Sequence, residues 1–139
     1  MRYRLLGRSG CAVSELCLGT MTFGAETDEA GAHEHLDVFV EAGGTLVDTA
    51  NVYSAGVSEE IIGRWLAARP RDVTEGVVIA TKGRFATDPG PNGNGLSARH
   101  LTRALDASLG RLGTDAVDLY QVHAYDPYTP KSLACWTRT

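Results

Sequence analysis

The chain has 139 residues, of which 43% are hydrophobic and 22% charged, and it contains 16 glycines. This composition is typical of one globular domain with its own core and argues against disorder. The formal net charge of −4 at pH 7 excludes the basic surface typical of nucleic-acid-binding proteins. No apolar run approaches the roughly 18 residues of a membrane span, and the first residues lack a secretory signal. We therefore expect a cytoplasmic protein that binds neither nucleic acids nor membranes.

The cysteines and two of the histidines give no sign of a metal site. Cys11, Cys17 and Cys135 are odd in number and lack the paired spacing of metal ligands, which fits free thiols in a reducing compartment. His33 and His35 are two residues apart in a predicted helix, so they point in different directions. We therefore expect no metal and place both histidines on the solvated surface.

The first third of the chain predicts a β-hairpin followed by strand, helix and strand. Residues 3–6 and 11–13 flank the turn-forming segment GRSG and predict the hairpin. Residues 16–20 predict a short buried strand. Thr27 or Asp28 can cap a helix that runs to about residue 42 and ends at two glycines. Residues 45–47 predict the next strand, which is short and apolar.

A second helix and a third strand of the sheet follow. Ser58 is the predicted N-cap of this helix, with Glu59 and Glu60 in the first turn, where carboxylates favour the positive end of the helix dipole. Pro70 is expected to end the helix. Residues 77–80, with the sequence VVIA, then predict a continuous apolar strand.

The last predicted elements are a long loop, a helix and a strand. Residues 83–95 are rich in Gly, Pro, Asn and Asp and predict a mobile surface loop, which at the active end of a barrel often serves as a substrate lid. Ser97 is expected to cap a helix that ends before Gly113. Residues 117–122 predict the last strand.

Three predicted strands in succession end in an ionisable residue. Asp48, Lys82 and His123 take these places, and Tyr53 follows Asp48 by five residues. Taken singly, each could be structural, with Asp48 forming a turn and Tyr53 packing on a helix. Because the carboxyl ends of parallel strands meet at one end of a sheet, the repetition instead predicts a shared site. The alternation of strands and helices predicts an α/β fold, a partial (β/α)8 TIM barrel.

Five segments carry a family resemblance, and they occur in this order: YRLLGRSGCAVSELCLGTMTFG, DTANVYSAGVSEEIIGRWL, IATKGRF, GPNGNGLSARHL and DLYQVHAYDP. In this order they resemble the amino-terminal half of the aldo-keto reductase family. The resemblance implies a barrel of which this chain supplies the amino-terminal hairpin and about four βα units. We assign residues 1–128 to this half-barrel and residues 129–139 to a tail that departs from the family pattern.

The resemblance implies that the family reaction, reduction of a carbonyl group by hydride from NADPH, uses four residues of this chain. Tyr53 would donate the proton, Lys82 would be the cation beside it, Asp48 would pair with Lys82, and His123 would orient the carbonyl oxygen. The chemistry is consistent, because an ammonium beside a phenol favours loss of its proton and a carboxylate keeps the ammonium charged. An imidazole can donate to the oxygen on which charge develops.

The resemblance also implies cofactor contacts and limits to activity. We expect Gly19, Thr20, Met21 and Asp48 to contact NADPH, and a small carbonyl compound to be the substrate. A complete barrel needs about 250 residues, so we expect the fragment alone to be inactive or weakly active. Open sheet edges predict self-association. The alternatives are a non-catalytic interaction module and, ranked last, an aldolase that uses Lys82 as a Schiff base.

Overall fold

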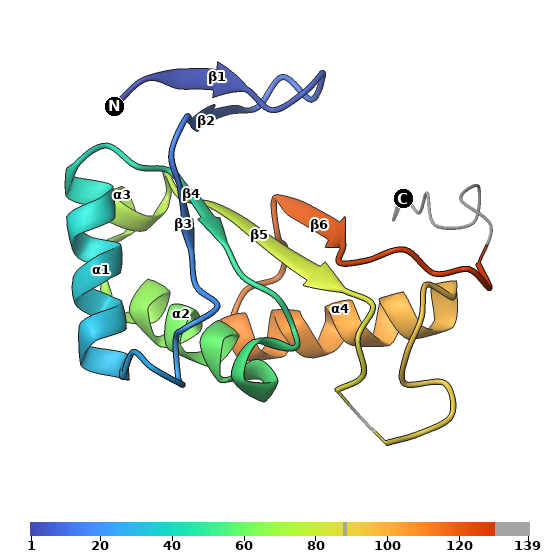
Figure 1. The fold of residues 1–139 in the computed structure, drawn as a ribbon. Helices are drawn as coiled ribbons and strands as arrows, with labels where there is room; N and C mark the ends of the chain where they lie inside the picture. Colours follow the sequence, from blue (N-terminus) through green and yellow to red (C-terminus); the bar gives the residue numbers. More distant parts are fainter. Residues whose placement is uncertain (88, 130–139) are drawn as a thin grey trace.

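The computed structural model describes residues 1–87 and 89–129. At the amino terminus, β1 (Tyr3–Leu5) pairs with β2 (Ala12–Ser14) in an antiparallel hairpin. The hairpin predicted from the GRSG turn is therefore confirmed, with slightly different strand limits. Figure 1 shows it above one end of the main sheet.

The main sheet is parallel and has four strands in the order β3-β4-β5-β6. These are β3 (Cys17–Gly19), β4 (Leu46–Asp48), β5 (Val78–Gly83) and β6 (Leu119–Val122). Each strand pairs with the next strand along the chain, as in a (β/α)8 barrel (Figure 1). The sheet is the predicted partial barrel, and its described strands do not close on themselves.

Helices connect the parallel strands. The long ones are α1 (Glu29–Glu41), α2 (Val57–Ala68) and α4 (Ala98–Leu112), and they lie on one side of the sheet (Figure 1). Two short elements were not predicted, the 3₁₀ helix η1 (Tyr53–Gly56) and the single-turn α3 (Arg71–Thr74). Both are too short to produce an apolar periodicity, which is why the sequence pattern does not reveal them.

Two of the predicted helix caps are confirmed. Asp28 accepts a hydrogen bond from the backbone N–H of Gly31 at 2.9 Å, at the start of α1. Ser97 accepts one from the N–H of His100 at 3.2 Å, at the start of α4. Each cap satisfies a backbone donor that the first helical turn leaves without a partner.

The predicted cap of α2 is wrong. The N-cap residue is Gly56, and no side chain caps this helix. Ser58 lies inside the first turn, where its buried hydroxyl donates to the backbone oxygen of Thr20 at 2.9 Å. The hydroxyl therefore joins α2 to the end of β3 instead of closing its own helix.

Alternation along the strands separates two faces of the sheet. The helix face carries Val47, Ile79 and Thr81, which are 0%, 5% and 0% exposed. It packs on apolar side chains of the three long helices, which include Ala32, Leu36, Ile61, Ile62, Trp65 and Leu112. The opposite face, here called the uncovered face, carries the half-buried residues Leu46 and Val78. The core therefore lies between the sheet and one layer of helices.

The remaining predictions concern the loop, the histidines and the tail. Positions 84–87 and 89–95 form bends and turns without regular structure, as expected for the loop after β5. His35 is exposed, whereas His33 is half-buried and its Nε2 lies 3.2 Å from the backbone oxygen of Ile61. The predicted tail lies outside the described residues, except for Thr129. Within the described part, no helix is long and apolar enough to cross a membrane.

Candidate active site

The register of the parallel strands brings three polar side chains to the uncovered face. Asp48 is the last residue of β4 and pairs with Ala80. Lys82 follows Ala80 by two residues, and Gln121 of β6 pairs with Lys82. Because residues two apart in a strand point to the same face, Asp48, Lys82 and Gln121 share one face near the carboxyl ends of their strands.

Lys82 is the centre of this group. Its Nζ donates to Asp48 Oδ2 at 2.6 Å, to the backbone oxygen of Thr49 at 2.9 Å and to the phenol oxygen of Tyr53 at 3.1 Å. Three acceptors match the three N–H groups of an ammonium. The side chain of Lys82 is 13% exposed and that of Asp48 is 27% exposed, so the pair is mostly buried but still reached by water. The structure thus brings together three of the four predicted catalytic residues.

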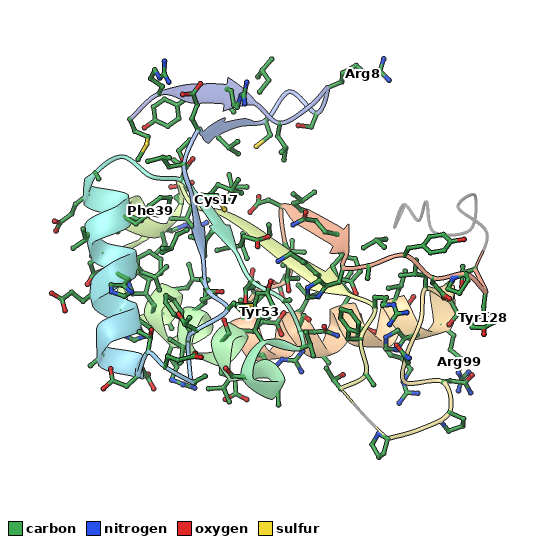
Figure 2. The ribbon with its side chains drawn as sticks, in the orientation of Figure 1. Arg8, Cys17, Phe39, Tyr53, Arg99 and Tyr128 are labelled. Carbon is green, nitrogen blue, oxygen red and sulfur yellow. The ribbon has the colours of Figure 1, made fainter. Side chains whose placement is uncertain are left out.

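Tyr53 is held in place by an unusual turn. It begins η1, and the next three residues, Ser54, Ala55 and Gly56, have φ angles of 48°, 55° and 100°. This left-handed conformation is readily adopted only by glycine, so the turn must be supported by its surroundings. One support is the hydroxyl of Ser54, which donates to the backbone oxygen of Phe23 at 2.8 Å. Figure 2 shows Tyr53 beyond the ends of β3 and β4.

His123, the fourth predicted residue, lies beside Tyr53. It follows β6, and its backbone N–H donates to the oxygen of Gly83 at 3.1 Å. Its ring meets that of Tyr53 edge-on, with 5.6 Å between centroids, and that of Phe85 with 5.0 Å between centroids. Burial, and secondly the positive charge of Lys82, lower the pKa of His123 below its ordinary value of 6.5. Both causes favour the neutral form of the imidazole.

The sequence did not reveal the roles of Gln121 and Phe85. Gln121 donates from its amide nitrogen to Asp48 Oδ1 at 3.0 Å, so the carboxylate is held by an amide on one oxygen and by Lys82 on the other. Strand alternation could have revealed Gln121, because it precedes His123 by two residues. Phe85 lies in the irregular loop after β5, where no periodicity indicates its direction.

The predicted cofactor contacts lie at the end of β3, beside Asp48. Gly19 pairs with Asp48, and a side chain added at Gly19 would meet nothing within 4 Å. Met21 is 66% exposed. Thr20 is fully buried, and its hydroxyl donates to the backbone oxygen of Asp48 at 3.1 Å and lies 2.9 Å from the hydroxyl oxygen of Ser58. Gly19 and Met21 are thus accessible to a ligand, whereas the hydroxyl of Thr20 is already engaged.

Two side chains near Lys82 have buried polar atoms that lack hydrogen-bond partners among the described residues. Asn51 is 0% exposed and both polar atoms of its amide lack a partner, although its backbone N–H donates to the oxygen of Lys82 at 3.2 Å. The Nδ1 atom of His123 is likewise buried without a partner. Such atoms are rare in native structures, and they fit a site that receives a polar ligand or ordered water.

A parallel α/β sheet with functional groups at the carboxyl ends of its strands is the arrangement of a barrel enzyme. The chain belongs to the aldo/keto reductase family, whose model matches residues 15–137. Several relatives in this family are oxidoreductases, and members of the family generally depend on NAD(P)H. The resemblance inferred from the sequence motifs is thereby confirmed.

Individual relatives match nearly all of this chain but only part of their own length. The chain is 46% identical to the uncharacterized oxidoreductase YrpG of Bacillus subtilis, over 94% of this chain and 42% of YrpG. It is 39% identical to norsolorinic acid reductase of Aspergillus flavus, over 89% and 35% respectively. It is 42% identical to a probable voltage-gated potassium channel subunit beta of Oryza sativa, over 94% and 39%. The chain thus spans less than half of each of these relatives.

Proposed function

We propose that this segment carries the proton-donating part of an NADPH-dependent carbonyl reductase, which converts an aldehyde or ketone into an alcohol. The contact of Lys82 Nζ with both Asp48 Oδ2 and Tyr53 Oη, at 2.6 and 3.1 Å, is the observation that supports this proposal. A phenol alone is a weak acid at neutral pH. An adjacent ammonium stabilises the phenolate that remains after proton transfer, and this makes the phenol a better donor.

In the proposed reaction, a nicotinamide cofactor held at the end of β3 would supply the hydride that reduces the carbonyl carbon. The electron pair of the carbonyl π bond moves to the oxygen, which takes the proton of the Tyr53 hydroxyl. Tyr53 is left as a phenolate beside the ammonium of Lys82, and a proton from solvent restores it. Asp48 keeps the ammonium charged throughout, because its carboxylate is held by Gln121 and stays next to Nζ.

His123 would donate a hydrogen bond to the same carbonyl oxygen. A neutral imidazole has one N–H donor, and the lowered pKa of His123 favours this neutral form. A donor aimed at an oxygen that gains negative charge stabilises the transition state more than the ground state. The edge-on contact with Tyr53 keeps the two donors on the same side of the substrate.

The residues at the end of β3 fit a cofactor through their accessibility. We propose that the backbone at Gly19, the exposed Met21 and the carboxylate of Asp48 line the nicotinamide end of NADPH, with Thr20 supporting them from the core. The open space beside Gly19 allows a flat ring to approach the backbone closely.

The proposed site is tested best in a complete barrel. We would fuse residues 1–128 to the carboxyl-terminal part of YrpG and assay NADPH oxidation with an aromatic aldehyde. Lys82→Met should lower kcat by about 10²-fold or more, the range attributed to a positioned acid–base group. Arg103→Met, which removes an exposed cation on α4, is the matched control and should leave kcat unchanged. Equal activity of Lys82→Met and the parent would refute the assignment.

For the 139-residue chain itself, we propose weak activity or none. Its relatives are more than twice as long, and the contacts to the diphosphate and adenosine are expected from their later loops. Titration of the purified chain with NADPH, followed by nucleotide fluorescence, should show no saturation at micromolar concentrations. Micromolar binding together with turnover of an aromatic aldehyde would contradict this expectation.

A second candidate is a non-catalytic interaction module that associates with itself. Among the described residues, β3 and β6 each have one edge without a pairing strand. These edges and the uncovered face favour this candidate, because exposed strand edges readily pair with another chain. One relative is a probable voltage-gated potassium channel subunit, so similarity to this family does not by itself imply catalysis. Light scattering during size-exclusion chromatography should detect oligomers, and a monomer at high concentration would argue against this candidate.

The aldolase alternative is disfavoured by the surroundings of Lys82. A Schiff-base lysine must present a neutral amine to a carbonyl carbon. Here Nζ donates to three oxygens, from Asp48, Thr49 and Tyr53, which is the environment of an ammonium. Borohydride treatment in the presence of an aldehyde should therefore trap no adduct on Lys82.

A further inference from the structure

A buried carboxylate that the proposed reaction does not use lies between the sheet and the helices that cover it. Glu59, in the first turn of α2, is 0% exposed. Its Oε1 accepts a hydrogen bond from the hydroxyl of Thr81 at 2.5 Å, and its Oε2 accepts one from Nε of Arg111 at 2.7 Å. This carboxylate therefore connects α2, β5 and α4 through two hydrogen bonds.

One of these connections reaches the strand residue beside the proposed cation. Thr81 directly precedes Lys82 in β5, and neighbouring residues of a strand point to opposite faces. Through the Thr81 hydroxyl, Glu59 thus holds β5 from the helix side of the sheet. The next residue of the strand is Lys82, whose side chain points to the uncovered face. The position of Nζ depends on where the backbone of β5 lies.

The other connection reaches the turn that follows Tyr53. A side-chain carbon added at Gly56 would lie 2.8 Å from Cδ and 2.9 Å from Nε of Arg111, so the arginine stem lies directly against this glycine. Gly56 ends the left-handed run that begins at Ser54. The stem of Arg111 therefore supports the strained turn from the side of α4.

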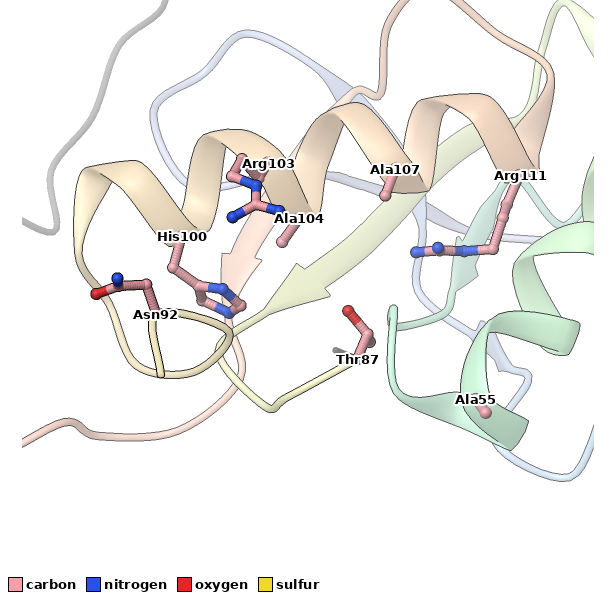
Figure 3. Close-up of a pocket in the computed structure, with 8 residues that line it drawn as sticks. All are labelled: Ala55, Thr87, Asn92, His100, Arg103, Ala104, Ala107 and Arg111. Carbon is pink, nitrogen blue, oxygen red and sulfur yellow. The ribbon is translucent and has the colours of Figure 1, made fainter. Parts of the chain in front are cut away.

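The surroundings of the turn leave it room to move. Ala55 and Arg111 both line a cavity of about 250 Å³ between η1 and α4 (Figure 3). Figure 3 shows the Arg111 side chain extending from the end of α4 across the side of the cavity that faces η1. Because left-handed non-glycine residues carry conformational strain, removal of this support would allow the turn to relax into the cavity.

We propose that Arg111 and Glu59 are positioning residues for the pair of Tyr53 and Lys82. Arg111 holds the turn that carries Tyr53, Glu59 holds the strand that carries Lys82, and their ion pair joins the two. The inference rests on the proposed function, because it gives a second layer of support to the same two groups. It needs no cofactor, since it concerns the geometry of this chain alone.

The test measures that geometry by NMR in the 139-residue chain. In the parent, the edge-on contact of Tyr53 and His123 should give nuclear Overhauser effects between the two rings. Arg111→Met keeps a stem of similar length but loses the hydrogen bond and the charge that hold the stem to Glu59. It should therefore abolish these effects and shift the ε-methylene signal of Lys82. Arg111→Lys keeps both the stem against Gly56 and the charge beside Glu59, so it should retain the ring contacts.

A second ion pair provides the matched control. Arg69 donates to Asp37 from Nε at 2.8 Å and from a terminal nitrogen at 2.6 Å, and this pair joins α1 to α2 away from η1. Arg69→Met should lower stability without changing the signals of Tyr53, His123 or Lys82. Parent-like ring contacts in folded Arg111→Met, or their loss in Arg69→Met, would overturn the proposal.

If Arg111→Met does not fold, the double variant Glu59→Gln/Arg111→Met removes both charges and leaves no buried ion alone. It should fold and also lose the ring contacts, and a folded double variant that keeps them would overturn the proposal. These readouts do not involve turnover. Failure of the positioning role is therefore distinguishable from failure of the proposed reductase activity.

Discussion

An ion pair lies on each side of the sheet, one between strand residues and one between helix residues, and the two pairs are built differently. On the uncovered face, Lys82 and Asp48 lie 2.6 Å apart with 13% and 27% of their side chains exposed. On the helix face, Arg111 and Glu59 lie 2.7 Å apart with 19% and 0% exposed. The first pair can be approached by a ligand, and the second is enclosed on its carboxylate side.

This difference separates a reactive group from a supporting one. The carboxylate of Glu59 also affects Tyr120, the phenol paired with Thr81 on the helix face. Burial, and secondly the charge of Glu59, raise the pKa of Tyr120 to about 12, so this phenol keeps its proton. Tyr53 has an ammonium beside it instead of a carboxylate. Of these two phenols, only the one on the side of Lys82 has surroundings suited to proton donation.

The largest expected difference between the two faces is in stability. Arg111→Met leaves the fully buried Glu59 without its cation, which should cost about 3–5 kcal/mol in the free energy of unfolding. Lys82→Met leaves Asp48 partly hydrated and bonded to Gln121, so it should cost at most about 1 kcal/mol. Urea unfolding followed by tryptophan fluorescence measures both losses. Equal losses of unfolding free energy would contradict the expected difference between the two pairs.

A glycine in α2 tests how closely the helix face is packed. A side-chain carbon at Gly63 would lie 2.5 Å from the backbone oxygen of Arg111 and 2.8 Å from that of Leu112. Gly63→Ala should therefore push α2 away from α4 and lower the free energy of unfolding by about 1–3 kcal/mol. The control is Gly110→Ala on α4, where an added carbon meets nothing within 4 Å. Because alanine favours a helix, that change should stabilise the protein by about 0.5–1 kcal/mol.

The pair of Asp37 and Arg69 should give a smaller effect that depends on pH. The hydrogen bond from Arg69, and secondly that from Trp65, lower the pKa of Asp37 from 3.8 to about 2. The folded state thus favours the charged form of Asp37. The carboxylate therefore contributes to the free energy of unfolding above pH 3.8, and this contribution is lost as the pH falls through about 2. Asp37→Asn should cost about 1 kcal/mol at pH 7, since the pair is partly hydrated.

Thermal unfolding of parent and Asp37→Asn across this pH range provides the measurement. The difference in unfolding free energy should shrink steadily between pH 3.8 and about 2. A difference that stays constant down to pH 2 would show that the carboxylate charge is not its cause.

The smallest expected effect is a shift in the titration of His123. Its pKa lies below 6.5 because of burial first and the charge of Lys82 second. Lys82→Met removes the second cause, so the pKa should rise towards 6.5 while burial still holds it down. Proton NMR of the imidazole C–H signals follows both titrations. An unchanged titration midpoint would mean that the charge of Lys82 does not lower the pKa of His123.

Much of the fold and part of the site could be predicted from the sequence, because they depend on local patterns. Apolar runs at strand and helix spacing predict the sheet and the three long helices. The contact of Asp48 with Lys82 follows from their places at the ends of neighbouring parallel strands. The tetrad roles themselves remain proposals.

The support for the site could not be predicted, because it depends on distant contacts. Glu59 in a first helical turn has an ordinary explanation in the helix dipole, and nothing local shows that it is buried. Arg111 lies 52 residues further along the chain. The turn at residues 54–56 contains one glycine, and its two other left-handed residues carry no sequence signal. Only the packing of α2 against α4 brings these parts together.

The order of strands in the sheet also bears on synthesis. Ribosomes make proteins from the amino terminus, so in longer relatives the strands equivalent to β3, β4, β5 and β6 leave the ribosome before the rest of the barrel. These four strands follow one another in space as they do along the chain. The nascent segment can therefore assemble its helix layer early and present the edge of β6 as the template for the next strand. Until that strand arrives, the edge of β6 is left without a pairing strand, and unpaired strand edges promote aggregation.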